Sequence, residues 1–367
     1  MSLVDLLISR ATQTKQPISG TFELTARCNL SCKMCYIHNR DFDASIFKNE
    51  LTTEQWIDIA DQAAENGTLL LLLTGGEPTL RPDFCKIYRA CAERGFLLTV
   101  NTNGTLLTDE MFELFKEHPP LRMNVSLYGA CEETYAELCG HSAAFYSVVE
   151  NIKRLRSLGV AVQINFSATP YNHHEAKAVY DFAQSVGAQM QHTAYMFPPT
   201  RTACQDCFQR FSPEEAALVM IEYMRLSHSS DDFSAYCKRM LSEALPRLDD
   251  CGNIYDGVRC RAGRAAFWVT YEGKMLPCGM IPNITSSVLE LGFAQSWSNT
   301  VAAFSNVKAP EGCLSCEHYS RCDVCPAISF AEKHDLSAVP NYICEKNHAY
   351  RSALLSIVKK SEEESCV

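Results

Sequence analysis

The sequence predicts an α/β fold: a partial (β/α)6 TIM-like barrel followed by a small cysteine-rich, loop-rich domain. Three observations predict it. Six apolar runs alternate with amphipathic segments over the first two thirds of the chain. The roughly 210 residues before Tyr236 are too few for eight βα units, so the barrel is expected to be open. After about residue 246, cysteine, glycine and proline become frequent and clear helical periods are lost until the end of the chain.

Several of the apolar runs are near-continuous, as expected when both faces of a parallel strand are covered. The six runs are FELTA (22–26), TLLLLLT (68–74), FLLTVNT (96–102), RMNVSL (122–127), VAVQINFSA (160–168) and MQHTAYM (190–196). Helix start signals lie between or after them, because Thr52 with Gln55, and Ser212 with Glu215, are spaced as capping boxes. Active groups are therefore expected on the loops at the C-terminal ends of the strands.

These patterns divide the chain into five expected parts. They are an N-terminal extension (1–19), the barrel (20–236), a linker (237–250), the cysteine-rich domain (251–350) and a C-terminal tail (351–367). The cysteine-rich part has little apolar sequence for a core, so bound metal is expected to stabilise it instead.

Composition narrows the class of protein. The chain has 367 residues, 21% charged and 47% hydrophobic, which is typical of a globular protein. A net charge of -10 argues against binding to nucleic acid or to an anionic membrane surface. The longest leucine run, Leu69 to Leu73, is too short to span a bilayer, and the N-terminus lacks the pattern of a secretory signal. A cytoplasmic protein is therefore predicted.

The 19 cysteines are clustered, and clustered cysteines in a reducing compartment indicate metal binding rather than disulfides. Cys28, Cys32 and Cys35 follow directly after the first predicted strand. Three thiolates can hold three corners of a [4Fe–4S] cube and leave the fourth iron open to a small molecule. Alternatively, a fourth ligand elsewhere in the chain completes a closed zinc or iron–sulfur site. This loop alone leaves both interpretations open.

The motif GGEP, residues 75–78, ends the second strand. Its glycines allow close approach of backbone to a ligand, and Glu77 can accept hydrogen bonds from an ammonium group. With CNLSCKMC (28–35), GGEP, NTNGT (101–105) and VSLYG (125–129), the chain resembles the radical S-adenosylmethionine (SAM) enzymes over roughly residues 20 to 230. The resemblance implies that the open iron binds the amino and carboxylate groups of SAM. It also implies cleavage of SAM to methionine and a 5′-deoxyadenosyl radical, which abstracts a hydrogen from the substrate.

The same resemblance implies roles for particular residues. Gly75 to Glu77 would hold the methionine amino group, Asn103 and Ser126 would lie near the ribose or carboxylate, and Met34 would flank the adenine. The implied cofactor-binding set is Met34, Gly75, Gly76, Glu77, Pro78, Asn103 and Ser126. Related enzymes often have an arginine in the stretch after the fourth strand, where this chain has TYAELCG with Cys139.

The C-terminal cysteines carry a second resemblance. Residues 313–325 read CLSCEHYSRCDVC and would alone suit a zinc knuckle. The chain resembles the SPASM domain over about residues 255 to 350, in the order Cys260, Gly273, Cys278, this run and Cys344. One spacing departs from the common pattern, because two residues and not three separate Cys322 from Cys325. SPASM domains hold two auxiliary [4Fe–4S] clusters. The ligands implied are Cys251, Cys260, Cys278 and Cys325 for the first, and Cys313, Cys316, Cys322 and Cys344 for the second. The motif itself gives seven cysteines, so Cys251 is the expected eighth; without it the first cluster would have an iron open to substrate.

Other residues are candidates for contact with substrate. Cys204 and Cys207 form a CxxC after the sixth strand and could supply a hydrogen atom or a redox pair, or be incidental thiols. Cys139 is a further candidate hydrogen donor. His192 and Tyr195 lie on the sixth predicted strand and could face the barrel interior or be hydrogen-bonded core residues.

The sequence thus predicts a SAM-dependent radical oxidoreductase with three [4Fe–4S] clusters and an external electron donor of the flavodoxin or ferredoxin type. SPASM relatives mostly mature peptides by crosslinking, oxidation or epimerisation, so a peptide substrate is expected. Because only about twenty residues precede the first predicted strand, a separate N-terminal leader-binding domain is not expected. The alternatives are radical modification of a small molecule (an amino acid, sugar or cofactor precursor), a zinc-stapled binding protein without catalysis, and a plain electron-transfer protein. No nucleic-acid or membrane partner is expected.

Overall fold

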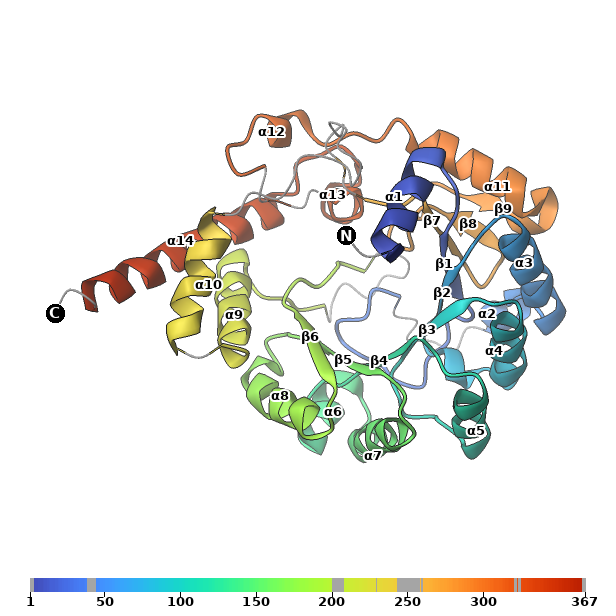
Figure 1. The fold of residues 1–367 in the computed structure, drawn as a ribbon, viewed down its shortest axis with the longest axis horizontal. Helices are drawn as coiled ribbons and strands as arrows, with labels where there is room; N and C mark the ends of the chain where they lie inside the picture. Colours follow the sequence, from blue (N-terminus) through green and yellow to red (C-terminus); the bar gives the residue numbers. More distant parts are fainter. Residues whose placement is uncertain are drawn as a thin grey trace.

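The computed structural model describes residues 3–37, 44–199, 208–228, 230–242, 258, 260–319, 322 and 325–364. One curved sheet organises the protein, and its strand order is β6-β5-β4-β3-β2-β1-β7-β8-β9 (Figure 1). Neighbouring strands from β6 to β1 and on to β7 are parallel. The first six strands are β1 (Ser19–Glu23), β2 (Leu70–Thr74), β3 (Leu97–Thr102), β4 (Arg122–Ser126), β5 (Val162–Ser167) and β6 (Gln189–Thr193). The prediction of an α/β partial barrel is confirmed.

Helices follow the strands and cover the outside of the curved sheet in Figure 1. Helix α1 (Leu3–Thr14) precedes β1. The helices between β1 and β6 are α2 (Ala44–Asn49), α3 (Thr53–Glu65), α4 (Phe84–Glu93), α5 (Asp109–Glu117), α6 (Glu132–Cys139), α7 (Ala144–Ser157) and α8 (Ala176–Ser185), with short 3-10 turns at Pro78–Leu80 and His173–Glu175. After β6 come α9 (Pro213–Leu226) and α10 (Ser230–Ser242).

Local sequence signals explain where the helices begin and how they pack. Both expected capping boxes are present, with the Thr52 hydroxyl accepting from the Gln55 amide and the Ser212 hydroxyl from the Glu215 amide. Helix α3 then buries Trp56 completely, and its ring lies 5.0 Å from that of Phe22 on β1. Burial of such large apolar side chains on one helix face fixes each helix against the sheet.

The C-terminal part continues the barrel sheet, which sequence reasoning did not predict. Strand β7 (Ala266–Val269) pairs in parallel with β1, and β8 (Lys274–Leu276) and β9 (Ser286–Ser287) follow antiparallel. The expectation that helical periods are lost after residue 246 also missed α11 (Val288–Phe304), which Gly292 interrupts with a positive φ. Helices α12 (Glu311–Leu314), α13 (Pro326–Lys333) and α14 (Asn341–Glu364) complete the chain.

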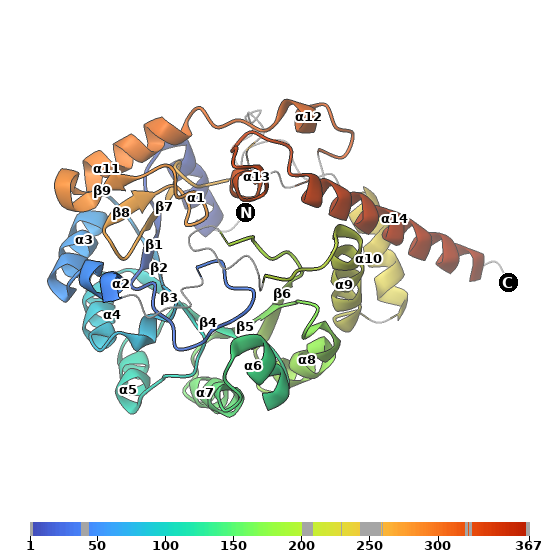
Figure 2. The same ribbon diagram turned by 180° about the vertical axis from the view of Figure 1, so that it is seen from behind.

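Helix α14 crosses the expected boundary at residue 350 and packs along α9 and α10, as both views show (Figure 2). Leu354 of α14 is buried with Ile221, Phe233 and Cys237, so this helix is anchored by an apolar contact of its own. Among the helices that the structure describes, none combines the length and apolar character needed to cross a bilayer.

Candidate active site

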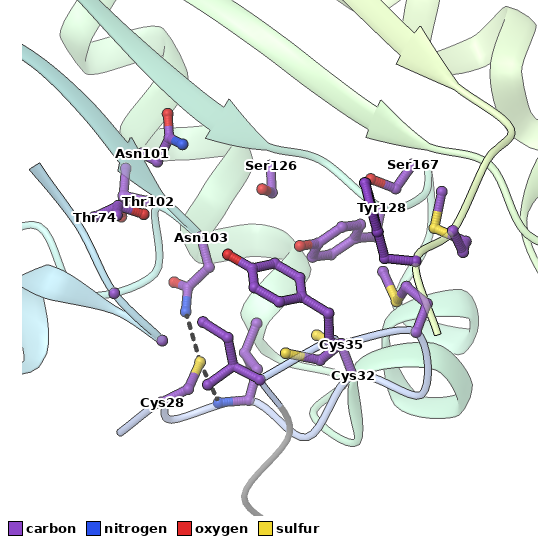
Figure 3. A pocket seen from close by; sticks show the side chains of 18 of the residues that line it. Cys28, Cys32, Cys35, Thr74, Asn101, Thr102, Asn103, Ser126, Tyr128 and Ser167 are labelled. Carbon is purple, nitrogen blue, oxygen red and sulfur yellow. Dashed lines mark hydrogen bonds between the residues drawn. The ribbon is translucent and has the colours of Figure 1, made fainter. Parts of the chain in front are cut away.

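A cavity of about 390 Å³ opens at the C-terminal ends of the barrel strands, where the sequence placed the active groups. Such a volume lies within the range of small-ligand and cofactor sites. Figure 3 shows Asn101 and Thr102 of β3, Ser126 of β4 and Ser167 of β5 on one side, facing the cysteine loop on the other. Among the described residues that line it, none carries a formal charge, so recognition there depends on neutral donors, acceptors and backbone.

All three cysteines of the first motif line this cavity. Their loop is fixed against the end of α6, because the Ser31 and Lys33 amides donate to the carbonyls of Cys139 and Leu138 at 3.0 and 2.9 Å. The Leu30 amide points at the Cys28 sulfur at 3.4 Å, and the Asn103 side-chain nitrogen lies 3.7 Å from the same sulfur (Figure 3). Backbone and side-chain donors therefore already surround one predicted ligand.

Gly75 and Gly76 line the cavity, and their small size is required by a neighbouring segment of chain. A Cβ at Gly75 would lie 2.5 Å from the Thr25 carbonyl oxygen, and one at Gly76 would lie 2.4 Å from that of Arg27. The Gly76 and Glu77 amides donate to these same two oxygens at 2.8 Å each. The glycines thus bind the GGEP loop directly to the chain that leads into the cysteine loop.

The Glu77 side chain is fully buried and does not line the cavity. Its Oε1 accepts from the Thr79 amide at 3.0 Å, the Thr79 hydroxyl at 2.5 Å and the Thr102 hydroxyl at 2.8 Å. Its Oε2 accepts from the Asn103 amide at 2.6 Å. Burial raises the pKa of Glu77, and these four donors oppose that rise. The carboxylate therefore joins the ends of β2 and β3, a role that the motif alone did not reveal.

The thiols of the loop are held in a poorly solvated environment. Burial raises the pKa of Cys28 to about 12, although the Leu30 amide partly opposes the effect. A hydrogen bond with the Cys139 thiol, and then burial, raise the pKa of Cys32 well above its ordinary value. Cys139 is fully buried beside Cys32 and does not line the cavity, so the structure places this hydrogen-donor candidate behind the cysteine loop.

The remaining candidates separate into two groups. Met34, Asn103, Ser126 and Tyr195 line the cavity, whereas Pro78 and His192 do not. The His192 ring packs 4.7 Å from that of Tyr223 on α9, and burial lowers the pKa of His192. Cys204, Cys207 and Cys251 lie outside the described residues.

Tyr195 connects the cavity to the C-terminal part. Its hydroxyl donates to Glu332 of α13 at 2.8 Å, and Arg210 makes two bonds to the same carboxylate at 2.6 and 2.9 Å. The guanidinium also lies over the Tyr342 ring, 4.1 Å from its centre. Burial alone would raise the pKa of Glu332, but Arg210 and Tyr195 outweigh it and hold this pKa below its ordinary value. Sequence reasoning missed Glu332 and Arg210, because their partners are more than 100 positions apart.

A second cavity, of about 80 Å³, lies in the C-terminal part. Its lining includes Cys313, Cys316, Cys322 and Cys344, the four cysteines that the SPASM resemblance assigns to one cluster. Among the described residues, no three His, Cys, Asp or Glu side chains converge on a single metal-ion position. Four cysteines around one cavity match the all-thiolate ligand sets of both a [4Fe–4S] cluster and a structural zinc ion, so the lining fits either group.

Three of the four cysteines assigned to the other auxiliary cluster also lie together. Cys260, Cys278 and Cys325 pack against one apolar group that includes Ile281 and Phe304. Tyr36 and Phe197, which line the active-site cavity, pack against the same group. The three cysteines and two aromatic residues of the cavity wall therefore share one apolar group.

The fold and this cavity define a partial barrel with a pocket, lined by three cysteines of one loop, at the C-terminal ends of its strands. Residues 22–183 match the family model described as the radical SAM superfamily. Residues 22–183 therefore form a radical SAM domain, and the protein is an enzyme. This domain implies one [4Fe–4S] cluster and SAM as cofactors.

Two similar proteins are named for the synthesis of different products, heme and a bacteriocin. Over 337 residues, the chain is 28% identical to the AdoMet-dependent heme synthase of Methanosarcina barkeri, which covers 88% of this chain and 95% of that protein. Over 278 residues, it is 30% identical to the antilisterial bacteriocin subtilosin biosynthesis protein AlbA of Bacillus subtilis, covering 75% and 57% of the two chains.

Among solved structures, Streptococcus suis SuiB bound to its precursor peptide SuiA matches with a TM-score of 0.71 at 19% identity. The match covers 90% of this chain and 76% of SuiB. At this identity, the likeness supports the shared fold and not a shared substrate.

Proposed function

We propose that this protein is a radical SAM oxidoreductase in which Cys28, Cys32 and Cys35 hold the SAM-cleaving cluster and two further clusters handle the electron. The observation that carries the proposal is the single cavity lined by all three cysteines, Gly75 and Gly76. When bound, the cluster supplies the electron that cleaves SAM and so generates the radical that abstracts a substrate hydrogen.

The chain's own residues would bind and orient SAM. Backbone groups of Gly75 and Gly76 are at the cavity wall and would accept from the ammonium group, while Glu77 keeps their loop in place. Ser126 and Asn103 offer neutral polar groups to the ribose or carboxylate. Met34 would pack against the adenine. The apolar wall of Tyr195, Met196 and Phe197 would keep water from the radical.

The two auxiliary sites would be held by Cys260, Cys278, Cys325 and Cys251, and by the quartet of the second cavity. The packing of three of these cysteines against one apolar group, and of four around a cavity of about 80 Å³, supports this assignment. An external donor of the flavodoxin or ferredoxin type would reduce the protein.

Metal and sulfide analysis after anaerobic purification tests the three-cluster arrangement. We expect about twelve irons per chain with matching sulfide, and about eight after Cys28, Cys32 and Cys35 are all replaced by alanine. About four irons with zinc would restrict the redox role to the barrel. Zinc without iron, even after reconstitution, would contradict the proposal and favour the zinc-stapled binding protein.

We propose a peptide as the substrate. The similarity to AlbA, a bacteriocin biosynthesis protein, supports this class. Short peptides encoded beside the gene should then raise 5′-deoxyadenosine formation above the rate with SAM and reductant alone. A deuterated peptide should transfer its label to the 5′-deoxyadenosine.

A second candidate is a heme precursor, which belongs to the cofactor-precursor class. It is favoured because the match to the heme synthase spans 95% of that protein, whereas those to AlbA and SuiB span 57% and 76%. The same assay with an iron porphyrin such as Fe-coproporphyrin III separates the two. Stimulation by the porphyrin and by no peptide would replace the first substrate class with the second.

A further inference from the structure

Asn347 lies beside the four-cysteine cavity of the C-terminal part. Its side-chain nitrogen donates to the Cys322 sulfur at 3.1 Å. Residues three apart share one face of a helix, so Asn347 and Cys344 both point from α14 toward the cavity, which both of them line. One turn of α14 thus carries Cys344, a predicted cluster ligand, and Asn347, which donates to the predicted ligand Cys322.

The surroundings of the quartet add further donors. The backbone amide of His318 points at the Cys316 sulfur at 3.4 Å, and its ring lies 4.9 Å from that of His348. Both histidines line the cavity. A side-chain donor differs from the backbone amide in one respect: a single substitution can remove it without moving the chain.

Hydrogen bonds to cluster sulfurs are among the factors that set the potential of an iron–sulfur centre. An added electron increases the negative charge on the sulfurs, and an N–H dipole directed at a sulfur stabilises that charge. From this contact we infer that Asn347 raises the reduction potential of the cluster held by Cys313, Cys316, Cys322 and Cys344. Asn347 is therefore a tuning residue that acts through Cys322 and not a ligand. The inference rests on the auxiliary clusters of the proposed function.

The test uses the full chain with Cys28, Cys32 and Cys35 replaced by alanine, so that only the auxiliary clusters give signals. Each protein is reconstituted anaerobically, its iron is counted, and its clusters are titrated against potential and followed by electron paramagnetic resonance. The variants are Asn347→Leu, which removes the donor at similar size, and Asn347→Asp, which replaces it with a negative charge. Asn341→Leu, the same change at the exposed start of α14, is the matched control.

We expect one of the two midpoints to move to more negative potential in Asn347→Leu and further in Asn347→Asp. The other midpoint should stay in place, and Asn341→Leu should match the parent. Unchanged midpoints in both Asn347 variants, with about eight irons retained, would overturn the inference while leaving the clusters intact. About four irons in the parent itself would instead show that one auxiliary cluster of the proposed function is absent. If the site that lacks iron is the one formed by Cys313, Cys316, Cys322 and Cys344, the inference about Asn347 would be overturned as well.

Discussion

A substitution at Glu77 can distinguish two roles for this residue: direct contact with SAM, or positioning of the loops that form the site. The glutamate of GGEP was expected to hold an ammonium group, yet four donors from Thr79, Thr102 and Asn103 satisfy its carboxylate inside the protein. The substitution Glu77→Gln keeps the size of the side chain and replaces one acceptor oxygen with an NH2 group. The arrangement that preserves most contacts places this NH2 against the Asn103 amide.

Two donors would then face each other across a distance that is 2.6 Å in the parent protein. Each buried donor without an acceptor costs about 1–3 kcal/mol, so the two donors together should cost about 2–6 kcal/mol. Relief of the buried charge offsets part of this cost. Because the Asn103 side chain lies 3.7 Å from the Cys28 sulfur, displacement of Asn103 should also weaken SAM binding.

The measurement pairs thermal unfolding of the metal-free protein with SAM affinity of the reconstituted protein. Glu23→Gln is the matched control, because Glu23 is also fully buried but accepts from Trp268 and does not line the cavity. We expect Glu77→Gln to lower the unfolding temperature and SAM affinity together, and Glu23→Gln to leave SAM affinity unchanged. Parent-like unfolding with complete loss of SAM binding would refute the positioning role and show that Glu77 contacts the ligand.

Three further predictions concern the loop, the rim and the metal. Gly76→Ala should abolish iron incorporation at the cysteine loop, because its Cβ would meet the Arg27 oxygen, whereas Gly95→Ala, with nothing within 4 Å, should cost only backbone strain; normal iron in Gly76→Ala would contradict this. The pKa of Glu332 is lowered in the folded state, so its pairing with Arg210 stabilises the protein above the ordinary glutamate pKa of about 4.3 and less as pH falls below it. Glu332→Gln should therefore reduce stability at neutral pH and less in acid; an equal loss at both would contradict the linkage. Iron removal by a chelator should abolish SAM cleavage but preserve the far-ultraviolet circular dichroism of the barrel, whose core is apolar; large loss of helix signal would show that metal holds the barrel together.

The barrel could be predicted from the sequence because the signals for its strands and helices lie within short segments of the chain. Six apolar runs matched the six strands to within a few residues, and two capping boxes marked helix starts correctly. The position of the cysteine loop followed from the rule that groups at parallel strand ends share one edge. None of these inferences required knowledge of which distant segments meet.

Contacts between distant segments could not be predicted in the same way. Strands β7 to β9 are two to four residues long, too short to show a period, and β7 pairs with a strand nearly 250 positions earlier. The partners of Glu77 became evident only once the ends of β2 and β3 were adjacent. Tyr195 and Glu332 are polar residues of unremarkable sequence context, and their link depends on how α13 lies over the barrel.

The continuation of the sheet makes the two parts of the chain mutually dependent. Phe267 of β7 is almost fully buried, packs 6.5 Å from Phe22 and 4.9 Å from Phe293, and covers Gly20 so closely that a Cβ there would lie 2.3 Å from its ring. A chain ending at Ser242 would expose this apolar surface and leave β1 as an open edge strand, which favours aggregation.

We therefore expect the barrel alone, residues 1–242, to be insoluble or to elute as large aggregates in size-exclusion chromatography, while the full chain elutes as a defined species. Restoring the missing part as a separate chain, residues 243–367, should recover soluble complex if lost packing is the cause. A soluble, cooperatively unfolding barrel would instead show that β1 needs no partner on this side. In that case the cysteine-rich part would be an appended module, and not a part of the same folding unit that closes one edge of the active-site barrel.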